Sequence, residues 1–161
     1  MKKIKNPWVG QKGYDCFACS PDNPIGLHMS FYEDGDDIIS YWCPQEHFQG
    51  WGGIMHGGIL GTLIDETCGW VITRKLQTTG FTMQLNVKYK HPVNVADSQL
   101  TIRAHITSQK KNIVFINAVI ENANGEVCVE GEAVYYACTK EKAKEMGFSP
   151  CEVEDEQLLS M

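Results

Sequence analysis

The segment 57–76 constrains the fold most, because it has the pattern of a long helix that is apolar on nearly every side. Its apolar residues recur at spacings of three and four, which is the helical period. They are Ile59, Leu60, Leu63, Ile64, Cys68, Val71 and Ile72. A helix with so few polar positions must be wrapped by other parts of the chain. The segment therefore predicts a fold built around one central helix.

Strand-like segments surround this helix in the sequence. Two short ones, at 27–32 and 38–43, flank a polar turn centred on Gly35 and suggest a hairpin. Four longer ones follow the helix and are rich in Val, Ile, Thr, Tyr and Phe, at 81–89, 98–107, 113–122 and 127–138. One long helix wrapped by a curved antiparallel sheet is an α+β architecture.

The length of 161 residues suits one domain. We expect an irregular N-terminal segment over 1–24, the domain itself over 25–138, and a C-terminal helix with an acidic tail over 139–161. Because one face of the predicted sheet packs against the helix, the other face must be polar or must contact a partner.

Charge and hydropathy exclude several classes of function. With 14 Lys and Arg against 20 Asp and Glu, the net charge of −6 disfavours sequence-independent binding to nucleic acid. No apolar run is long enough to cross a bilayer, and no apolar stretch follows the basic N-terminus as in a secretory signal. We therefore expect a cytoplasmic protein with neither nucleic acid nor membrane as a partner. Seven cysteines at irregular spacings predict free thiols rather than a disulfide framework.

The start of the predicted helix carries the pattern His56-Gly57-Gly58. The N–H groups of a first helical turn have no partners within the helix, and they carry the positive end of the helix dipole. Glycine lets another group approach this backbone closely. The pattern therefore predicts a site for an anion or for a developing oxyanion.

Asp65 follows Gly58 by seven residues, which places it on nearly the same helix face about 10.5 Å further along the axis. That separation is too large for one chain to hold a single carbonyl between them. Two antiparallel copies of the helix would bring Asp65 of one subunit to Gly57 of the other, which predicts an obligate dimer with shared sites. Burial would raise the pKa of Asp65 and make it a stronger base. The alternative is that Asp65 and Glu66 only cap or pair with neighbouring groups.

Several motifs together resemble the hot-dog fold acyl-CoA thioesterases of the phenylacetic-acid-degradation (PaaI-like) group. The resemblance covers roughly residues 14–138. The motifs are His56-Gly57-Gly58, Leu63-Ile64-Asp65-Glu66 with Gly69-Trp70, the preceding loop Phe48-Gln49-Gly50-Trp51, the later segment Tyr89-Lys90-His91-Pro92-Val93, and the prefix Cys16-Phe17-Ala18-Cys19 with Asn23-Pro24-Ile25-Gly26-Leu27.

This resemblance implies roles for individual residues in the hydrolysis of an acyl-CoA thioester. The N–H of Gly57 would polarise the thioester carbonyl, and Asp65 of the partner subunit would attack it or activate water. His56 would shape the loop or position the acyl group, and Gln49 would contact the thioester or orient water. Gly58 and Glu66 are the neighbouring candidates for substrate contact.

Four lysines are candidates for binding the CoA phosphates as point charges. They are Lys88, Lys90, Lys110 and Lys111. The alternative is that they are solvated residues that protect strand edges from aggregation. We expect the dimers to pair again into a tetramer, and we expect no metal or redox cofactor, because thioester hydrolysis needs none.

Two other functions remain open. The first is a non-catalytic protein of the same fold that binds acyl-CoA or a related small acyl ligand. The second is a zinc-stabilised module, since Cys16 and Cys19 form half of a zinc pattern that His28, Cys43 or His47 would have to complete. No Gly-rich phosphate loop of the Walker or Rossmann type is present, and the absence of a Gly-x-Ser-x-Gly motif disfavours serine hydrolysis.

Overall fold

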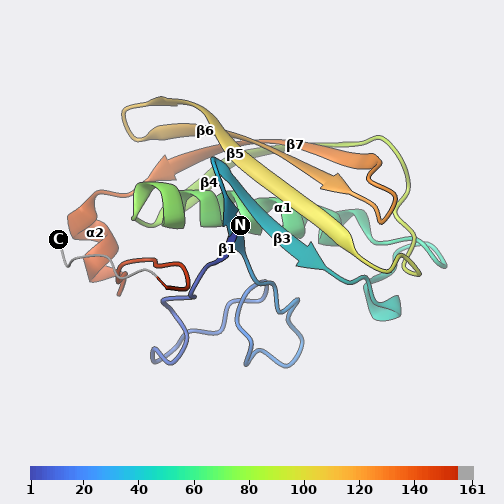
Figure 1. Cartoon of the computed structure of the whole chain (residues 1–161), viewed down its shortest axis with the longest axis horizontal. Coiled ribbons are helices and arrows are strands. Elements are labelled where there is room, and N and C mark those ends of the chain that lie inside the picture. Colours follow the sequence, from blue (N-terminus) through green and yellow to red (C-terminus); the bar gives the residue numbers. More distant parts are fainter. Residues whose placement is uncertain (156–161) are drawn as a thin grey trace.

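The computed structural model describes residues 1–155 and contains one sheet with a long helix across it (Figure 1). The strands are β1 (Lys2–Lys3), β2 (Tyr32–Asp34), β3 (Asp37–Trp42), β4 (Gly80–Tyr89), β5 (Leu100–Lys110), β6 (Ile113–Glu121) and β7 (Val127–Ala137). The helices are α1 (Gly57–Val71), which continues into a π-helical turn at Ile72–Leu76, and the short α2 (Lys140–Glu145). A 3-10 turn spans Glu46–Phe48.

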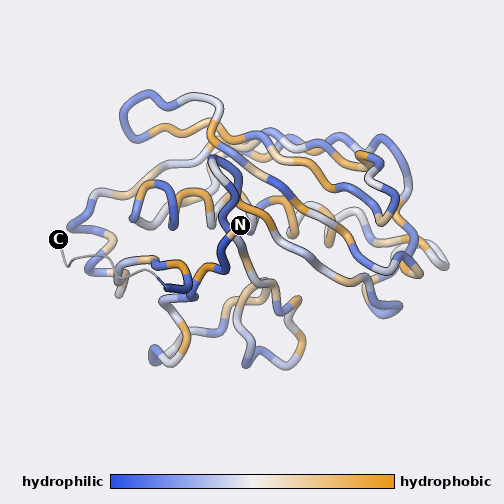
Figure 2. Tube along the Cα trace, viewed as in Figure 1, coloured by the Kyte–Doolittle hydropathy of each residue, from blue (hydrophilic) through white to orange (hydrophobic). Residues whose placement is uncertain are grey.

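Helix α1 packs against the inner face of the antiparallel sheet, as the helical period predicts. Leu63, Ile64 and Val71 are fully buried, and so are inward-facing residues of β5 and β6 such as Ile102 and Ile120. Figure 2 shows hydrophobic and hydrophilic residues alternating along these strands, which is the pattern of a sheet with one buried face. The prediction of a central helix wrapped by a curved antiparallel sheet is confirmed.

Close contact between helix and sheet depends on Gly131 of β7. A Cβ atom at this position would lie 2.7 Å from Cγ2 of Ile64, a separation that real side chains do not show. Glycine therefore sets the depth at which α1 rests on the sheet.

The strand order is β1-β2-β3-β5-β6-β7-β4, so β4 forms one edge. Its register pairs Gly80 with Ala137 at one end and Tyr89 with Val129 at the other. The opposite edge of β4 pairs with no strand in the described chain. Phe81 and Met83 on this strand are 53% and 59% exposed, which is unusual for large apolar side chains.

The prediction of a strand over 27–32 is wrong, because the regular ladder begins only at Tyr32. His28 adopts a left-handed conformation with a φ of 52°, which interrupts an extended backbone. The N–H groups of Leu27 and Met29 donate to the carbonyls of Phe17 and Ala18 instead. The apolar residues do alternate in this segment, but their backbone N–H groups donate to the N-terminal segment and not to a neighbouring strand.

Most of the N-terminal segment lies below α1 in Figure 1, whereas strands β6 and β7 lie above the helix and β3 crosses in front of it. The N-terminal segment contains the short strand β1, which pairs with β2 and was not expected within 1–24. Residues 156–161 of the expected acidic tail lie outside the described residues. No helix among residues 1–155 is long and apolar enough to cross a membrane.

Candidate active site

His56 caps the first turn of α1. This residue is the N-cap, with extended backbone angles, and its Nδ1 accepts a 2.9 Å hydrogen bond from the N–H of Gly58. The carbonyl of His56 accepts from the N–H groups of Ile59 and Leu60. Among residues 1–155, no acceptor engages the N–H of Gly57. The helix therefore presents one unsatisfied amide at its positive end.

A hollow of about 400 Å³ lies beside this turn. Gln49, His56 and Gly58 line it together, so the structure brings these three predicted site residues to one place. Gln49 is held by the N–H of Gly53, which donates to Oε1 over 3.0 Å. The remaining lining residues are His47, Phe48, Ile59 and Thr62. Polar side chains outnumber apolar ones in this lining, since only Phe48 and Ile59 are apolar.

Gly57 itself lines a different hollow, of about 240 Å³, next to the end of β4. The hydroxyl of Tyr89 donates a 2.6 Å hydrogen bond to the carbonyl of Gly57, and Lys90 lines the same hollow. Tyr89 thus fixes the orientation of the peptide group between Gly57 and Gly58. Sequence reasoning missed its role, because Tyr89 is far from Gly57 in the chain and only the pairing of β4 with β7 brings it there.

Asp65 lies further along α1, where the helix meets β4 and β7. Its Oδ1 accepts hydrogen bonds from Tyr135 Oη at 2.6 Å and from Thr82 Oγ1 at 2.7 Å. The Tyr135 hydroxyl is also 2.6 Å from the main-chain oxygen of Asp65. Burial, together with the charge of Asp65, raises the pKa of Tyr135 well above its usual range, so this hydroxyl stays a donor. The carboxylate is therefore held in one orientation.

Sequence reasoning also missed Tyr135 and Thr82. One signal was available for Tyr135, because it occupies an inward position of β7 in line with the buried Gly131 and Ala133. A buried tyrosine needs a partner for its hydroxyl, and Asp65 supplies it.

Within one chain, the helix separates Asp65 from Gly57 by eight residues, or about 12 Å along the axis. The structure therefore brings Gln49 together with His56 and Gly58, on either side of Gly57 in the chain, but does not bring Asp65 to them. The two parts of the predicted site lie on one helix at different heights.

Glu66 points away from both parts, toward the N-terminal segment. Its Oε1 accepts a 3.1 Å hydrogen bond from Trp70 Nε1 and lies 3.6 Å from Cys16 Sγ. Burial, followed by the charge of Cys16, raises the pKa of Glu66 to about 7. Hydrogen bonding with Cys19 lowers the pKa of Cys16 to about 5, whereas the bond to Cys16 and burial raise the pKa of the Cys19 thiol. These thiols and Glu66 form one coupled group.

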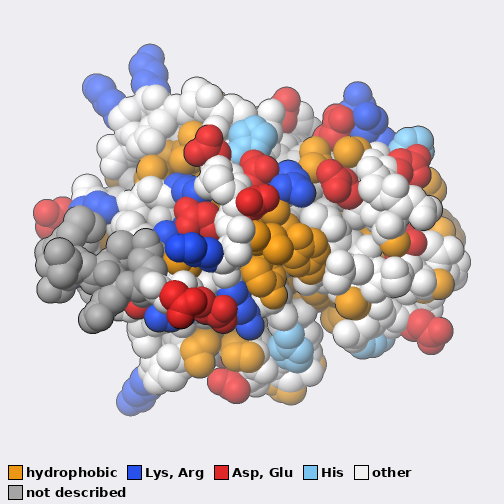
Figure 3. Space-filling model, in the orientation of Figure 1, with side chains coloured by type: hydrophobic (Ala, Val, Ile, Leu, Met, Phe, Trp, Pro, Cys, Tyr) orange, Lys and Arg blue, Asp and Glu red, His pale blue; other side chains and the backbone are white. Residues whose placement is uncertain are grey.

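The four candidate lysines do not lie together in one chain. Lys88 lies near the end of β4 and Lys90 directly follows the strand, both at the Gly57 end, and Lys90 forms an ion pair with Glu130 over 3.0 Å. Lys110 and Lys111 form the tip of the β5–β6 hairpin, at the other end of the sheet (Figure 1). Figure 3 shows acidic and basic side chains intermixed on the visible face, without a field of one sign.

Comparisons with known proteins agree with this architecture. Residues 52–129 match the family model described as the thioesterase superfamily. The match includes His56, Gly57 and Asp65. No curated protein matches the chain by sequence.

Solved structures share the fold at low sequence identity. The PaaI protein of the Escherichia coli phenylacetic acid degradation operon is 15% identical, with a TM-score of 0.64 over 70% of this chain and 81% of that one. A hypothetical thioesterase from Streptococcus pneumoniae, solved with coenzyme A, is 21% identical, with a TM-score of 0.63 over 68% of this chain and 87% of that one. A Haemophilus influenzae thioesterase is 17% identical, with a TM-score of 0.63 over 70% and 80% of the two chains.

These matches define a domain with the hot-dog fold. The thioesterase superfamily pattern that the motifs predicted is found over residues 52–129, and the predicted hot-dog fold is confirmed.

Proposed function

We propose that this protein hydrolyses an acyl-CoA thioester to the free acid and CoA. The observation that carries the proposal is the unsatisfied N–H of Gly57, held at the positive end of α1 beside a hollow lined by Gln49 and His56. An amide in this position polarises a thioester carbonyl and stabilises the oxyanion that forms when the carbonyl is attacked. The coenzyme A in the Streptococcus pneumoniae structure supports the substrate class.

Asp65 delivers the attack, either as the nucleophile or as the base that activates water. Tyr135 and Thr82 both donate to the same carboxylate oxygen, which leaves the second oxygen available to the reaction. Gln49 contacts the thioester or orients the attacking water, and His56 keeps the helix start in place. Lys90, at the Gly57 end, is the lysine best positioned to meet a CoA phosphate in the same chain.

Each active site combines Gly57 of one chain with Asp65 of a second chain. The free edge of β4 supports a dimer in which two such edges pair, so that the two α1 helices run antiparallel beside each other. Exposed edges are normally protected by charge, yet from Gly80 to Val87 this strand carries no charged residue and exposes Phe81 and Met83. A tetramer would then form through the outer sheet face, where Phe115 and Tyr136 are each 40% exposed.

A panel of acyl-CoA substrates, read out by release of free thiol, tests the proposed function. We expect turnover of at least one member, and we expect Asp65→Asn to lower it by about 10²- to 10⁴-fold with the fold preserved. Ligand binding without thiol release by the intact protein would instead support the non-catalytic acyl-CoA binder. An Asp65→Asn variant with full activity would refute the role of the carboxylate.

Mixing two inactive variants tests whether the site is shared. Gly57→Pro removes the amide hydrogen, and Asp65→Asn removes the carboxylate. In a mixed dimer one site carries both defects and the other carries neither, so co-refolded or co-expressed chains should regain roughly a quarter of wild-type turnover. A site built within one chain would regain none.

A further inference from the structure

Cys16, Cys19 and Glu66 form a compact group of metal-ligating atoms outside the proposed active site. The two sulfur atoms and a carboxylate oxygen all lie within 4.8 Å of one another. Among residues 1–155, no other group of three or more His, Cys, Asp or Glu side chains is arranged in this way. The cysteines come from a turn in the N-terminal segment, and Glu66 comes from the middle of α1. We propose that this group binds a thiophilic divalent cation of the Zn²⁺ type.

The separation of one sulfur atom and the carboxylate oxygen fits a tetrahedral ion. A Zn–S bond of about 2.3 Å and a Zn–O bond of about 2.1 Å, at the tetrahedral angle, place sulfur and oxygen about 3.6 Å apart. Cys16 Sγ and Glu66 Oε1 are 3.6 Å apart. Cys16 and Glu66 therefore stand at the separation that such an ion requires, and Cys19 Sγ lies within 4.8 Å of both.

Each ligand is also held by a neighbour, as in established metal sites, where outer contacts orient the ligands. Trp70 Nε1 donates to Glu66 Oε1 over 3.1 Å, and the N–H of Cys19 donates to Cys16 Sγ over 3.4 Å. Tyr14 Oη lies 2.9 Å from Cys19 Sγ and is itself held by Asn6 Nδ2 at 2.9 Å. These contacts come from the N-terminal segment and from α1.

The charge balance favours a cation. The group lines a pocket of about 310 Å³, and none of the described residues that line this pocket is a lysine or arginine. Cys19 is buried, and Cys16 and Glu66 are partly buried, so their ionised forms are costly without a positive partner. Two sulfur ligands select zinc-like metals over Mg²⁺ or Ca²⁺. Three protein ligands leave a fourth position for a water on the pocket side.

This ligand set differs from the one that the sequence suggested. His28 Nε2 contacts the carbonyl of Asn23 at 2.5 Å, His47 packs against Phe48, and Cys43 is exposed, so none of them completes the pair. Glu66, 47 residues after Cys19, takes that place. The metal would link the N-terminal segment to α1, because the ligands belong to both.

Metal binding by the full-length, reduced protein tests this assignment. After treatment with a chelator, the protein is titrated with Zn²⁺ in competition with a chromophoric chelator, and with Co²⁺ to observe the thiolate charge-transfer absorption. We expect one ion per chain and a charge-transfer band. The Cys16→Ser, Cys19→Ser double variant should bind Zn²⁺ at least about 100-fold more weakly and should lack the band, whereas Cys43→Ser, an exposed cysteine outside the group, should match the wild type.

Two further variants keep the test independent of folding defects. Glu66→Gln keeps the shape of the side chain but removes its charge, and it should weaken Zn²⁺ binding. Trp70→Phe keeps a ring stacked on Phe31, whose centroid is 4.7 Å away, but removes the N–H donor, and it should weaken binding about 10- to 100-fold.

Three results would overturn the proposal: no Zn²⁺ binding by the reduced protein, unchanged binding in the double variant, or a Cys16–Cys19 disulfide without zinc in the protein as isolated. None of these results depends on thioesterase activity.

Discussion

The two ends of the central helix differ sharply in how their backbone groups are satisfied. At the start, Gly58 is exposed and the amide of Gly57 engages no acceptor among residues 1–155. After Val71, side chains tie the end of the helix to other parts of the chain. Arg74 donates to Glu33 Oε2 at 2.8 Å and to the carbonyl of Cys151 at 2.7 Å.

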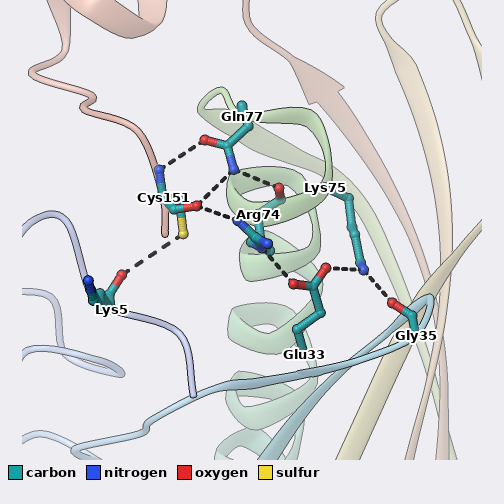
Figure 4. A network of polar contacts seen from close by, with 7 residues as sticks. All are labelled: Lys5, Glu33, Gly35, Arg74, Lys75, Gln77 and Cys151. Carbon is teal, nitrogen blue, oxygen red and sulfur yellow. Dashed lines mark hydrogen bonds and ion pairs between the residues drawn. The ribbon is translucent and has the colours of Figure 1, made fainter. Parts of the chain in front are cut away.

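Figure 4 shows the network of polar contacts that follows the last turn of α1. Lys75 pairs with Glu33 and reaches the carbonyl of Gly35, while Gln77 contacts the carbonyl of Arg74 and both the N–H and the carbonyl of Cys151. Cations and donors at a helix C-terminus compensate its free carbonyls and its negative dipole. The comparison shows that α1 is tied to other parts of the chain after its last turn, whereas its first turn offers a free N–H group to which a carbonyl oxygen can bind.

The largest effect is expected at the start of α1. Gly57→Pro should lower kcat/KM for an acyl-CoA that the wild type hydrolyses by about 10²- to 10³-fold, because it deletes the amide hydrogen. Proline suits the first helical position, and the extended backbone of His56 accepts a following proline.

Gly57→Ala is the matched control for that prediction. Its Cβ would lie 3.5 Å from the Tyr89 ring, an ordinary contact, and the amide hydrogen is kept. Alanine should therefore retain most of the activity. Equal losses in the two variants would show that bulk, not the amide, matters at this position.

Substitutions in the polar network at the end of α1 should change stability and not turnover. Partial burial by itself would raise the pKa of Glu33, but the hydrogen bonds and charges of Lys75 and Arg74 outweigh it and lower the pKa below its usual range. Glu33→Gln should lower the free energy of unfolding by about 1.5–3 kcal/mol at pH 7 and leave kcat/KM unchanged.

The pH dependence of that loss follows from the lowered pKa. A carboxylate with a depressed folded pKa contributes stability above its unfolded pKa and loses it as the pH falls through the folded value. Denaturant unfolding should therefore show the wild type and Glu33→Gln converging below about pH 4. Glu145→Gln, at an exposed pair with Lys142, should show no measurable change at either pH. A difference that persists at low pH would contradict the assignment to this charge network.

The smallest effect is expected from the cap at the start of α1. His56→Ala should lower the free energy of unfolding by about 1 kcal/mol, because the N–H of Gly58 loses its acceptor. His56→Asn should recover most of this loss, since asparagine is a strong N-cap residue. Thermal unfolding of the two variants side by side measures the difference, and equal melting temperatures would rule out a capping role.

Local patterns in the sequence were sufficient for the central helix, for the four long strands and for the motif around Gly57 and Asp65. Periodicity reports which face of an element is buried, and that information is local. The segment 27–32 shows its limit, since its alternating apolar residues are buried but pair with the N-terminal segment. Strand order was equally out of reach, because the position of β4 beside β7 depends on packing across the whole domain.

By itself, the sequence determined that one apolar helix is wrapped by a sheet and that a glycine amide begins it. Only the tertiary structure decided the partners of two adjacent acidic residues. Asp65 turns to Tyr135 and Thr82, whereas Glu66 turns to Trp70 and Cys16. Neighbours on a helix point about 100° apart, so their environments come from different, distant parts of the chain.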